Sequence, residues 1–158
     1  MAAARKRETF WTEPISKVDL QQAAVVPGGT TIVEAVKEMK LKRIGCVLVV
    51  DAESKLIGIL SNGDLMHEYV GSTLPGDTPV DTIMTPNPFT GSPELTVQEA
   101  LELFHSQSFR HMPIVSNGGI QGILSIRGLI SFISEHLPLE VMNLPPDSSL
   151  IPARPSGE

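Results

Sequence analysis

The hydrophobic and polar positions in the first half of the chain follow two kinds of pattern. A Thr-x-x-Glu motif leads into apolar residues at helical spacing, which predicts a capped helix over residues 31–42. Two continuous apolar runs, 46–50 and 56–60, flank a polar turn and predict a pair of strands. A short helix is expected over 62–69. Because the strands do not alternate apolar and polar residues, helices should cover the sheet.

The second half repeats this order of patterns. Apolar residues on one face predict a helix over 96–107, and the runs 112–115 and 120–125 predict a strand pair. The Asn-Gly-Gly sequence at 117–119 is typical of a hairpin turn, and 126–136 should form a closing helix. Each half therefore predicts the order β-α-β-β-α, an α/β (α+β) fold.

The two halves also share residues at constant spacing. A displacement of 65 positions matches Pro14 with Pro79, Thr31 with Thr96, Glu34 with Glu99, Ala35 with Ala100 and Val50 with Val115. After a one-residue slip in the polar turn, the Gly-Ile-Leu-Ser sequence at 58–61 matches that at 122–125. Loops tolerate such slips, so the chain consists of two copies of one module. A unit of about 60 residues is marginal alone, so the copies should share a core.

Changes in composition divide the chain into five segments. They are an N-terminal arm (1–13), the first copy (14–72), a Gly- and Pro-rich linker (73–78), the second copy (79–137) and a Pro-rich C-terminal tail (138–158). The arm contains Trp11, which is expected either to mark an interface or to cover the sheet edge of its own copy. Apolar residues in the tail leave open that it docks on a neighbour.

The charge and the cysteine content limit the classes of partner and the cellular setting that we expect for the chain. With 12 basic and 18 acidic residues the net charge is −6, which argues against a nucleic-acid binder because phosphate contacts need a basic face. The single cysteine, Cys46, stands in an apolar run and is expected to be a small buried residue. The lack of a disulfide framework indicates a reduced, cytoplasmic setting. No apolar stretch approaches the roughly 18 residues of a membrane span.

Several motifs together resemble one known family. In the first copy these are Val-Pro at 26–27, Thr-Ile-Val-Glu-Ala at 31–35, the strand pair with its Leu-Ile-Gly-Ile-Leu-Ser, and Asp64-Leu65. In the second they are Ile-Met-Thr at 83–85, Arg-His-Met-Pro-Ile-Val at 110–115 and Gly-Ile-Leu-Ser. These residues resemble the cystathionine β-synthase (CBS) domain over 14–137. The resemblance implies a tandem pair packed by pseudo-twofold symmetry, often a homodimer, whose clefts bind adenosine nucleotides and which regulates a partner protein.

The resemblance also assigns residues to a ligand site. Asp64 matches the position whose carboxylate accepts the ribose hydroxyls, and Ser61 would direct its hydroxyl to a phosphate. The alternative from the residues alone is that both cap the following helix. An adenine slot would be lined by Val26, Ile44 and Val47, which are equally suited to the core.

The second copy departs from the family pattern at one position. Gly128 stands where the first copy has Asp64, so in the sequence Ser125-Ile-Arg127-Gly the carboxylate is missing. Arg127 keeps a cation there, and Arg110 and His111 match positions where the family often places phosphate-contacting basic residues. If the symmetry brings these groups together, one composite nucleotide site results. The alternative is ordinary surface charge for the arginines and a partly buried histidine.

Catalytic and metal-binding motifs are missing from the sequence. It has no phosphate loop, nucleophile elbow or His-Glu-x-x-His pattern, and its four histidines are scattered. We therefore expect no enzyme, metal or cofactor. We expect a regulatory module that binds AMP, ADP, ATP or S-adenosylmethionine between the repeats and signals to a partner. The alternative is a ligand-free dimerisation or protein-interaction module.

Overall fold

The computed structural model of the chain describes residues 10–137. The predicted C-terminal tail, 138–158, and the first nine residues of the N-terminal arm lie outside this range. The described part of the arm forms a 3₁₀ turn, Phe10–Thr12, and a second 3₁₀ turn, Ile15–Lys17, follows.

The first copy contains the elements that its pattern predicts. They are β1 (Val25–Pro27), α2 (Ile32–Lys42), β2 (Cys46–Val50), β3 (Leu56–Ser61), α3 (Asn62–Asp64) and a π-helical turn (Leu65–Tyr69). All five residues of β2 are buried, as its unbroken apolar run requires. The predicted short helix is thus one α-turn that widens into a π-turn.

The second copy follows the same order after a linker. Its elements are a 3₁₀ turn (Val80–Thr82), β4 (Thr85–Pro86), α4 (Val97–Gln107), β5 (His111–Ser116), β6 (Gly119–Ser125) and α5 (Ile126–His136). The predicted hairpin turn is confirmed, because Ser116 pairs with Gly119 around a two-residue loop. Both loop residues, Asn117 and Gly118, have the positive φ that this tight turn requires.

Capping boxes begin the two long equivalent helices. Thr31 caps α2 and Thr96 caps α4. In each, the threonine hydroxyl accepts from the backbone N–H of a glutamate three positions on, and that carboxylate accepts from the threonine N–H. The Thr-x-x-Glu prediction is therefore confirmed in both copies.

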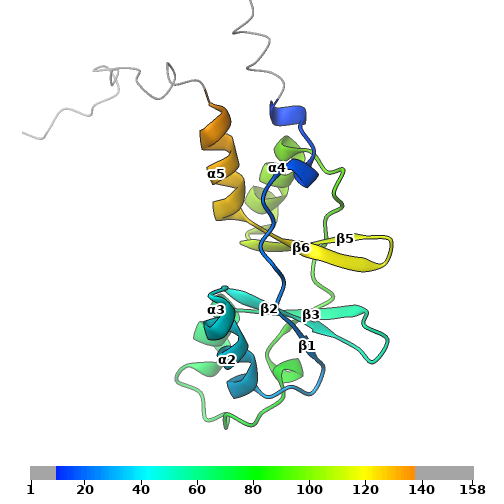
Figure 1. Cartoon of the computed structure of the whole chain (residues 1–158). Helices are drawn as coiled ribbons and strands as arrows, with labels where there is room; N and C mark the ends of the chain where they lie inside the picture. Colours follow the sequence, from blue (N-terminus) through cyan, green and yellow to red (C-terminus); the bar gives the residue numbers. More distant parts are fainter. Residues whose placement is uncertain (1–9, 138–158) are drawn as a thin grey trace, which may run out of the picture.

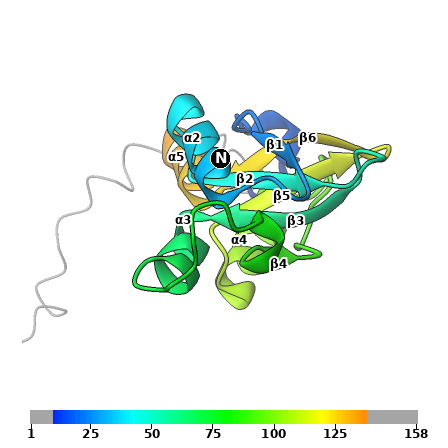
Figure 2. The ribbon, with the colours of Figure 1, turned by 90° about the horizontal axis from the view of Figure 1, so that it is seen from below.

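The two sheets lie face to face in the middle of the molecule. One has the order β1-β2-β3-β4 and the other is the hairpin β5-β6. Figure 1 shows α2 and α3 beyond the first sheet and α4 and α5 beyond the second. Figure 2 shows both hairpins pointing to the same side. The facing sides of the sheets share a small core of Cys46, Leu48, Ile59 and Ile123, so the copies are joined by buried apolar surface.

Contacts between the copies occur in equivalent pairs. Ile59 of β3 pairs with Thr85, and the matching Ile123 of β6 pairs with Gln21. A second pair of antiparallel bridges joins Thr31 to Pro79 and Pro14 to Thr96. In every case the leading segment of one copy lies along the other copy. This reciprocity is the pseudo-twofold symmetry that the resemblance to the CBS domain implies.

The crossing segments also contribute to each other's cores. Ile15 and Val18 are buried in the core of the second copy, while Val80 and Ile83 are buried in the core of the first. Trp11 packs against the second core as well, rather than covering the edge of its own copy. Each hydrophobic core therefore draws residues from both sequence repeats.

The two copies differ at one predicted strand. In the first, β1 pairs in parallel with β2 over three residues. In the second, the equivalent pairing is reduced to a single parallel bridge between Gly91 and Ile114. In the first copy Gly28 and Leu48 donate backbone N–H groups to this pairing, and the equivalent residues of the second copy, Pro93 and Pro113, have no N–H to donate, which prevents a longer ladder. The α/β fold is confirmed, with the opening strand of the second copy shortened.

Candidate functional site

Asp64 and Ser61 form a capping box at the start of α3. The backbone N–H and the hydroxyl of Ser61 both donate to Oδ2 of Asp64, at 2.7 and 2.6 Å. The N–H of Asp64 donates back to the serine Oγ at 3.3 Å. The carboxylate is therefore held in one orientation by its own turn. The capping role that the residues alone allowed is confirmed.

The other carboxylate oxygen faces the second copy. Thr85, on β4, donates its hydroxyl to Oδ1 of Asp64 over 3.4 Å, which is long for such a bond. Oδ1 thus retains most of its capacity to accept hydrogen bonds. We call the set of Ser61, Asp64 and Thr85 the Asp64 junction. Thr85 was not predicted as a site residue, because its contact with Asp64 depends on β4 crossing to the first sheet.

His111 also reaches from the second copy into this neighbourhood. An ideal Cβ placed on Gly45 would lie 3.1 Å from Nε2 of His111 and 3.5 Å from the amide nitrogen of Asn62, the residue after Ser61. Burial lowers the pKa of His111 below its ordinary 6.5, and the neighbouring Arg110 lowers it further. His111 is therefore the neutral imidazole at neutral pH. Arg110 itself is exposed.

The buried thiol of Cys46 is the pseudo-symmetric counterpart of His111. Its pKa is raised to about 12, first by burial and then by the negative charge of Asp64. Cys46 pairs with Ser61 across the β2–β3 ladder, and Ser61 holds the Asp64 carboxylate, so the charge and the thiol belong to the same end of the hairpin. As predicted, Cys46 is a small buried residue.

The other predicted cation lies elsewhere. Arg127, Ser125 and Gly128 line a groove of about 620 Å³ between α5 and residues 13–21. We call it the α5 groove; its remaining lining residues are Glu13, Lys17, Asp19, Gln21, Ser131, Phe132, Glu135 and His136. Neither Ser61 nor Asp64 lines it. The structure therefore separates Arg127 and Ser125 from the Asp64 junction. The junction lies where β3 leads into α3, whereas the α5 groove lies where β6 leads into α5.

The predicted adenine slot falls mostly within the first core. Val47 is completely buried and Val26 is 5 % exposed, and both belong to that core. Ile44 is partly exposed and packs against it. In this structure Val26 and Val47 offer little surface to a base, so of the three residues Ile44 alone retains accessible surface.

Residues 10–137 contain no group of three metal-ligating side chains that would hold an ion. Over the same residues, no helix combines the length and apolarity needed to cross a bilayer.

Known proteins resemble the chain across both copies. The CBS domain family pattern matches residues 15–71 and 80–135. The CBS domain-containing protein CBSCBSPB1 of Arabidopsis thaliana is 35% identical over 113 residues, which cover 71% of this chain and 21% of that protein. An uncharacterized 17.7 kDa protein of Acidianus ambivalens is 34% identical over 116 residues, or 73% of this chain and 70% of that protein. The chain thus spans about a fifth of the plant relative.

Solved structures show the same arrangement. An uncharacterized conserved protein from Pyrococcus horikoshii superposes with a TM-score of 0.71 at 23% identity, covering 87% of this chain and 98% of that one. A CBS domain protein from Pyrobaculum aerophilum, complexed with AMP, superposes with a TM-score of 0.71 at 25% identity, covering 78% and 98%. With both copies matched by the family pattern and the fold shared, the chain belongs to the CBS domain family as a tandem pair of CBS domains.

Proposed function

We propose that the chain is a non-catalytic regulatory module that binds an adenosine nucleotide at the Asp64 junction and signals its occupancy to a partner protein. The observation that carries the proposal is the orientation of Asp64, whose Oδ2 is fixed by Ser61 while Oδ1 faces the other copy. The AMP complex of the Pyrobaculum relative supports the choice of ligand.

The chemistry of ribose suits this carboxylate. Vicinal hydroxyls are two donors, and an ionised carboxylate oxygen accepts more than one hydrogen bond. Because Ser61 already holds the carboxylate, little conformational entropy is lost when a ribose binds. The weak bond from Thr85 can be exchanged for stronger ones from the ligand.

Two residues beside the start of β5, Arg110 and His111, are suited to contact the phosphate. Arg110 is exposed, and its guanidinium offers a planar set of N–H donors that suits a phosphate. The neutral His111 beside it supplies a ring N–H donor rather than a second charge. We therefore assign Arg110 as the phosphate contact and His111 as a hydrogen-bonding neighbour.

The site can signal because it is built from residues of both copies. Ser61 and Asp64 belong to the first copy, whereas Thr85 and His111 belong to the second. A nucleotide bound there contacts both copies and so stabilises one relative placement of them over others. A ligand shifts an equilibrium only through such differential contact.

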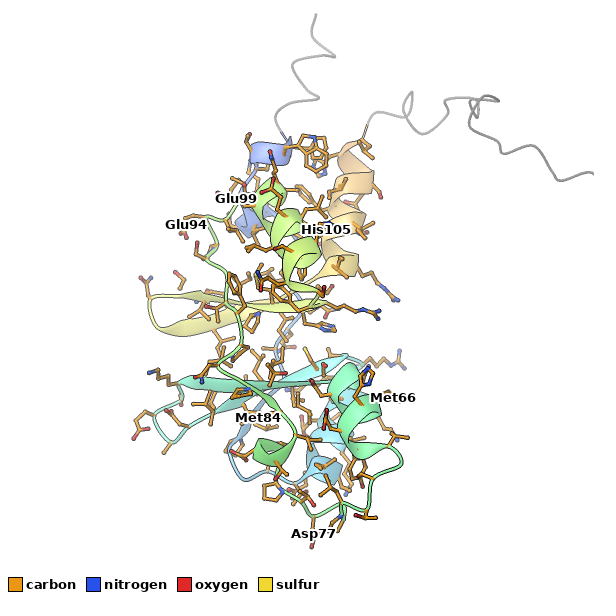
Figure 3. The ribbon with its side chains drawn as sticks, turned by 180° about the vertical axis from the view of Figure 1, so that it is seen from behind. Met66, Asp77, Met84, Glu94, Glu99 and His105 are labelled. Carbon is orange, nitrogen blue, oxygen red and sulfur yellow. The ribbon has the colours of Figure 1, made fainter. Side chains whose placement is uncertain are left out.

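The test is a thermal unfolding series with AMP, ADP, ATP, S-adenosylmethionine and GMP on three proteins. They are the wild type, Asp64→Ala and a matched control, Glu99→Ala. The control removes the same kind of capping carboxylate from α4, far from the junction (Figure 3). An adenosine ligand should raise the midpoint in the wild type and in Glu99→Ala, because it binds only the folded state. An unchanged rise in Asp64→Ala would contradict the ribose assignment.

A second candidate is a ligand-free dimerisation module. Five large apolar side chains on the helices or directly after the π-turn are exposed by 42 to 78 %, namely Val33, Leu41, Met66, Val70 and Ile130. Met66 points outward from its π-turn in Figure 3. Exposed apolar surface of this kind is typical of interfaces. If no nucleotide shifts the wild-type midpoint, light scattering of wild type and Met66→Glu would test this alternative, with dimer loss in the variant supporting it.

A further inference from the structure

The described residues contain two Asn-Gly sequences in different backbone conformations. Asn62-Gly63 begins α3, and Asn117-Gly118 forms the loop between β5 and β6. Asparagine is a thermolabile residue, and a glycine after it leaves the backbone nitrogen free of a hindering side chain, so that this nitrogen can attack the asparagine amide. Both asparagines are exposed, so access to solvent does not distinguish them.

The attack closes a five-membered imide ring that fixes the backbone of the asparagine. The ring contains the glycine nitrogen and the carbonyl carbon, Cα, Cβ and Cγ of the asparagine, so the nitrogen and Cβ must be eclipsed about the Cα–C bond. For an L-residue this eclipsing sets ψ to about −120°, the value at the first central residue of a type II′ turn, where φ is positive. An asparagine at the first position of a hairpin loop therefore reaches the ring by a change in ψ alone.

Asn117 is one peptide rotation away from this geometry. It has a φ of 51°, and Gly118 has a φ of 76°, the two positive values that define a type I′ turn. Types I′ and II′ share the φ of the first central residue and differ by a rotation of the peptide plane between the two central residues. The rotation gives the second residue a negative φ, which glycine adopts freely. Both types close two-residue hairpins, so the pair Ser116 and Gly119 is kept.

The loop does not oppose the rotation. Within residues 10–137, the N–H of Gly118 donates no hydrogen bond and the side-chain amide of Asn117 makes none. An ideal Cβ on Gly118 would have no atom within 4 Å, so the space around this peptide is open. The Gly118 nitrogen is therefore free to approach Cγ of Asn117.

Asn62 is held away from the same geometry by its helix. Its N–H donates to the carbonyl of Gly45 at 2.9 Å, and its own carbonyl accepts from the N–H of Leu65. A ψ of about −120° lies outside the allowed regions at the negative φ of a helical residue. The rotation would also separate Ser61 from Asp64 and break their capping box.

A third asparagine has the favourable φ but the wrong neighbour. Asn87 has a φ of 45°, and Pro88 follows it. The proline nitrogen carries no proton to lose, so it cannot become the nucleophile. Asn87 therefore serves as an internal control for the chemistry.

We propose that Asn117 is a site of spontaneous modification, converting to aspartate and isoaspartate through an imide with Gly118, while the helix protects Asn62. The Gly118 nitrogen gives its proton to hydroxide and bonds to Cγ of Asn117, and the Cγ–Nδ2 bond breaks to release ammonia. Water then opens the ring at Cγ to give aspartate, or at the backbone carbonyl carbon to give isoaspartate. Both products add a negative charge to the hairpin tip. Isoaspartate also adds one carbon to the main chain, so it no longer fits a two-residue loop.

Peptide mapping by mass spectrometry measures the conversion at each asparagine. The full chain is incubated at mildly alkaline pH, either folded or in urea. In the folded protein Asn117 should convert faster than Asn62 by roughly fivefold or more, the factor that the loss of one helix cap alone produces. In urea the two rates should converge, because glycine follows both residues. Asn87 should stay intact over the same time in both states.

A variant separates the charge from the change in the main chain. Asn117→Asp carries the added charge on an unaltered backbone, so its thermal midpoint should stay close to that of the wild type. The isoaspartate form, isolated by chromatography, should unfold at a lower temperature. The proposal is overturned if Asn117 in the folded protein reacts no faster than Asn62, or if their ratio is the same in urea. An isoaspartate form as stable as Asn117→Asp would overturn the effect on the hairpin.

Discussion

The ring of His111 in the second CBS domain lies directly over Gly45 of the first. An ideal Cβ on Gly45 would stand 3.1 Å from Nε2 and 3.2 Å from Cε1 of that ring. The pseudo-symmetric pair cannot make the same contact, because Arg110 stands in place of the glycine and Cys46 in place of the histidine. The duplicated fold is thus joined by an asymmetric contact next to Asn62, where α3 begins.

Gly45→Ala should therefore destabilise the protein by displacing the His111 ring. A contact of 3.1 Å is tighter than most Cβ contacts, so the ring must move by a few tenths of an ångström, and overpacking of this kind costs about 1–3 kcal/mol. Urea unfolding of the wild type and the variant measures the loss. Gly63→Ala is the control, because its Cβ would meet only the Oγ of Ser61 at an ordinary 3.5 Å. In a His111→Ala background the cost of Gly45→Ala should largely disappear, and a cost that persists would show that the ring is not its cause.

The stability of the protein should fall as the pH drops below about 6.5 because of His111. Burial, helped by Arg110, lowers the pKa of this residue in the folded state. The unfolded chain therefore takes up a proton at a higher pH than the folded chain does. Stability is full above the ordinary pKa of 6.5 and is lost as the pH falls from there toward the lower folded pKa.

Urea unfolding at a series of pH values measures this effect. His111→Gln carries no titrating group and should remove the dependence in that window. Glu34 and Glu99, whose pKa values are lowered by their threonine caps, affect stability only below their ordinary 4.5 and do not interfere. An identical pH dependence in His111→Gln would assign the effect to another residue.

The local pattern of the sequence was sufficient for the elements within each copy. Helix starts were predictable because a Thr-x-x-Glu box is a local interaction, and β2 was predictable because its apolar run is unbroken. The exchange of leading segments was not predictable from the pattern. Ile15 and Val80 look like ordinary core residues of their own copies, and only the three-dimensional pairing places each in the other core.

The candidate site was also predictable only where it depends on local sequence. Asp64 and Ser61 were identified as site residues from the resemblance to the CBS domain, while their spacing of three residues predicted the capping contact between them. The separation of Arg127 from Asp64 was not, since it depends on how the copies are oriented. The adenine slot was assigned by sequence position, which does not distinguish a core valine such as Val47 from one that faces a ligand.

Cys46 should resist thiol reagents in the folded protein. Its pKa of about 12 leaves almost no thiolate at neutral pH, and its side chain is buried. Labelling followed by mass spectrometry should therefore proceed only as fast as the protein opens, and quickly in urea. Asp64→Asn removes the smaller contribution to the raised pKa but not the burial, so it should remain slow. Rapid labelling of the native wild type would contradict the buried placement.

The equivalent glycines Gly58 and Gly122 should respond differently to alanine. Each lies where the leading segment of the other copy crosses its strand. At Gly58 the new methyl group would overlap the end of the Met84 side chain, the residue labelled beside the first sheet in Figure 3. At Gly122 it would lie 2.9 Å from Cβ of Leu20 and 3.0 Å from the backbone oxygen of Gln21.

These neighbours differ in their freedom to move. A methionine thioether has several rotatable bonds and can turn aside, whereas a backbone carbonyl and a Cβ are fixed by the strand pairing. Gly122→Ala should therefore cost about 1–3 kcal/mol of unfolding free energy, and Gly58→Ala less than about 1 kcal/mol. Urea unfolding of both variants gives the comparison, and Gly119→Ala is the control because its nearest contact is 3.6 Å. A larger loss at Gly58 than at Gly122 would mean that Met84 is as firmly held as the backbone. The crossing at β3 would then be held at least as firmly as the crossing at β6.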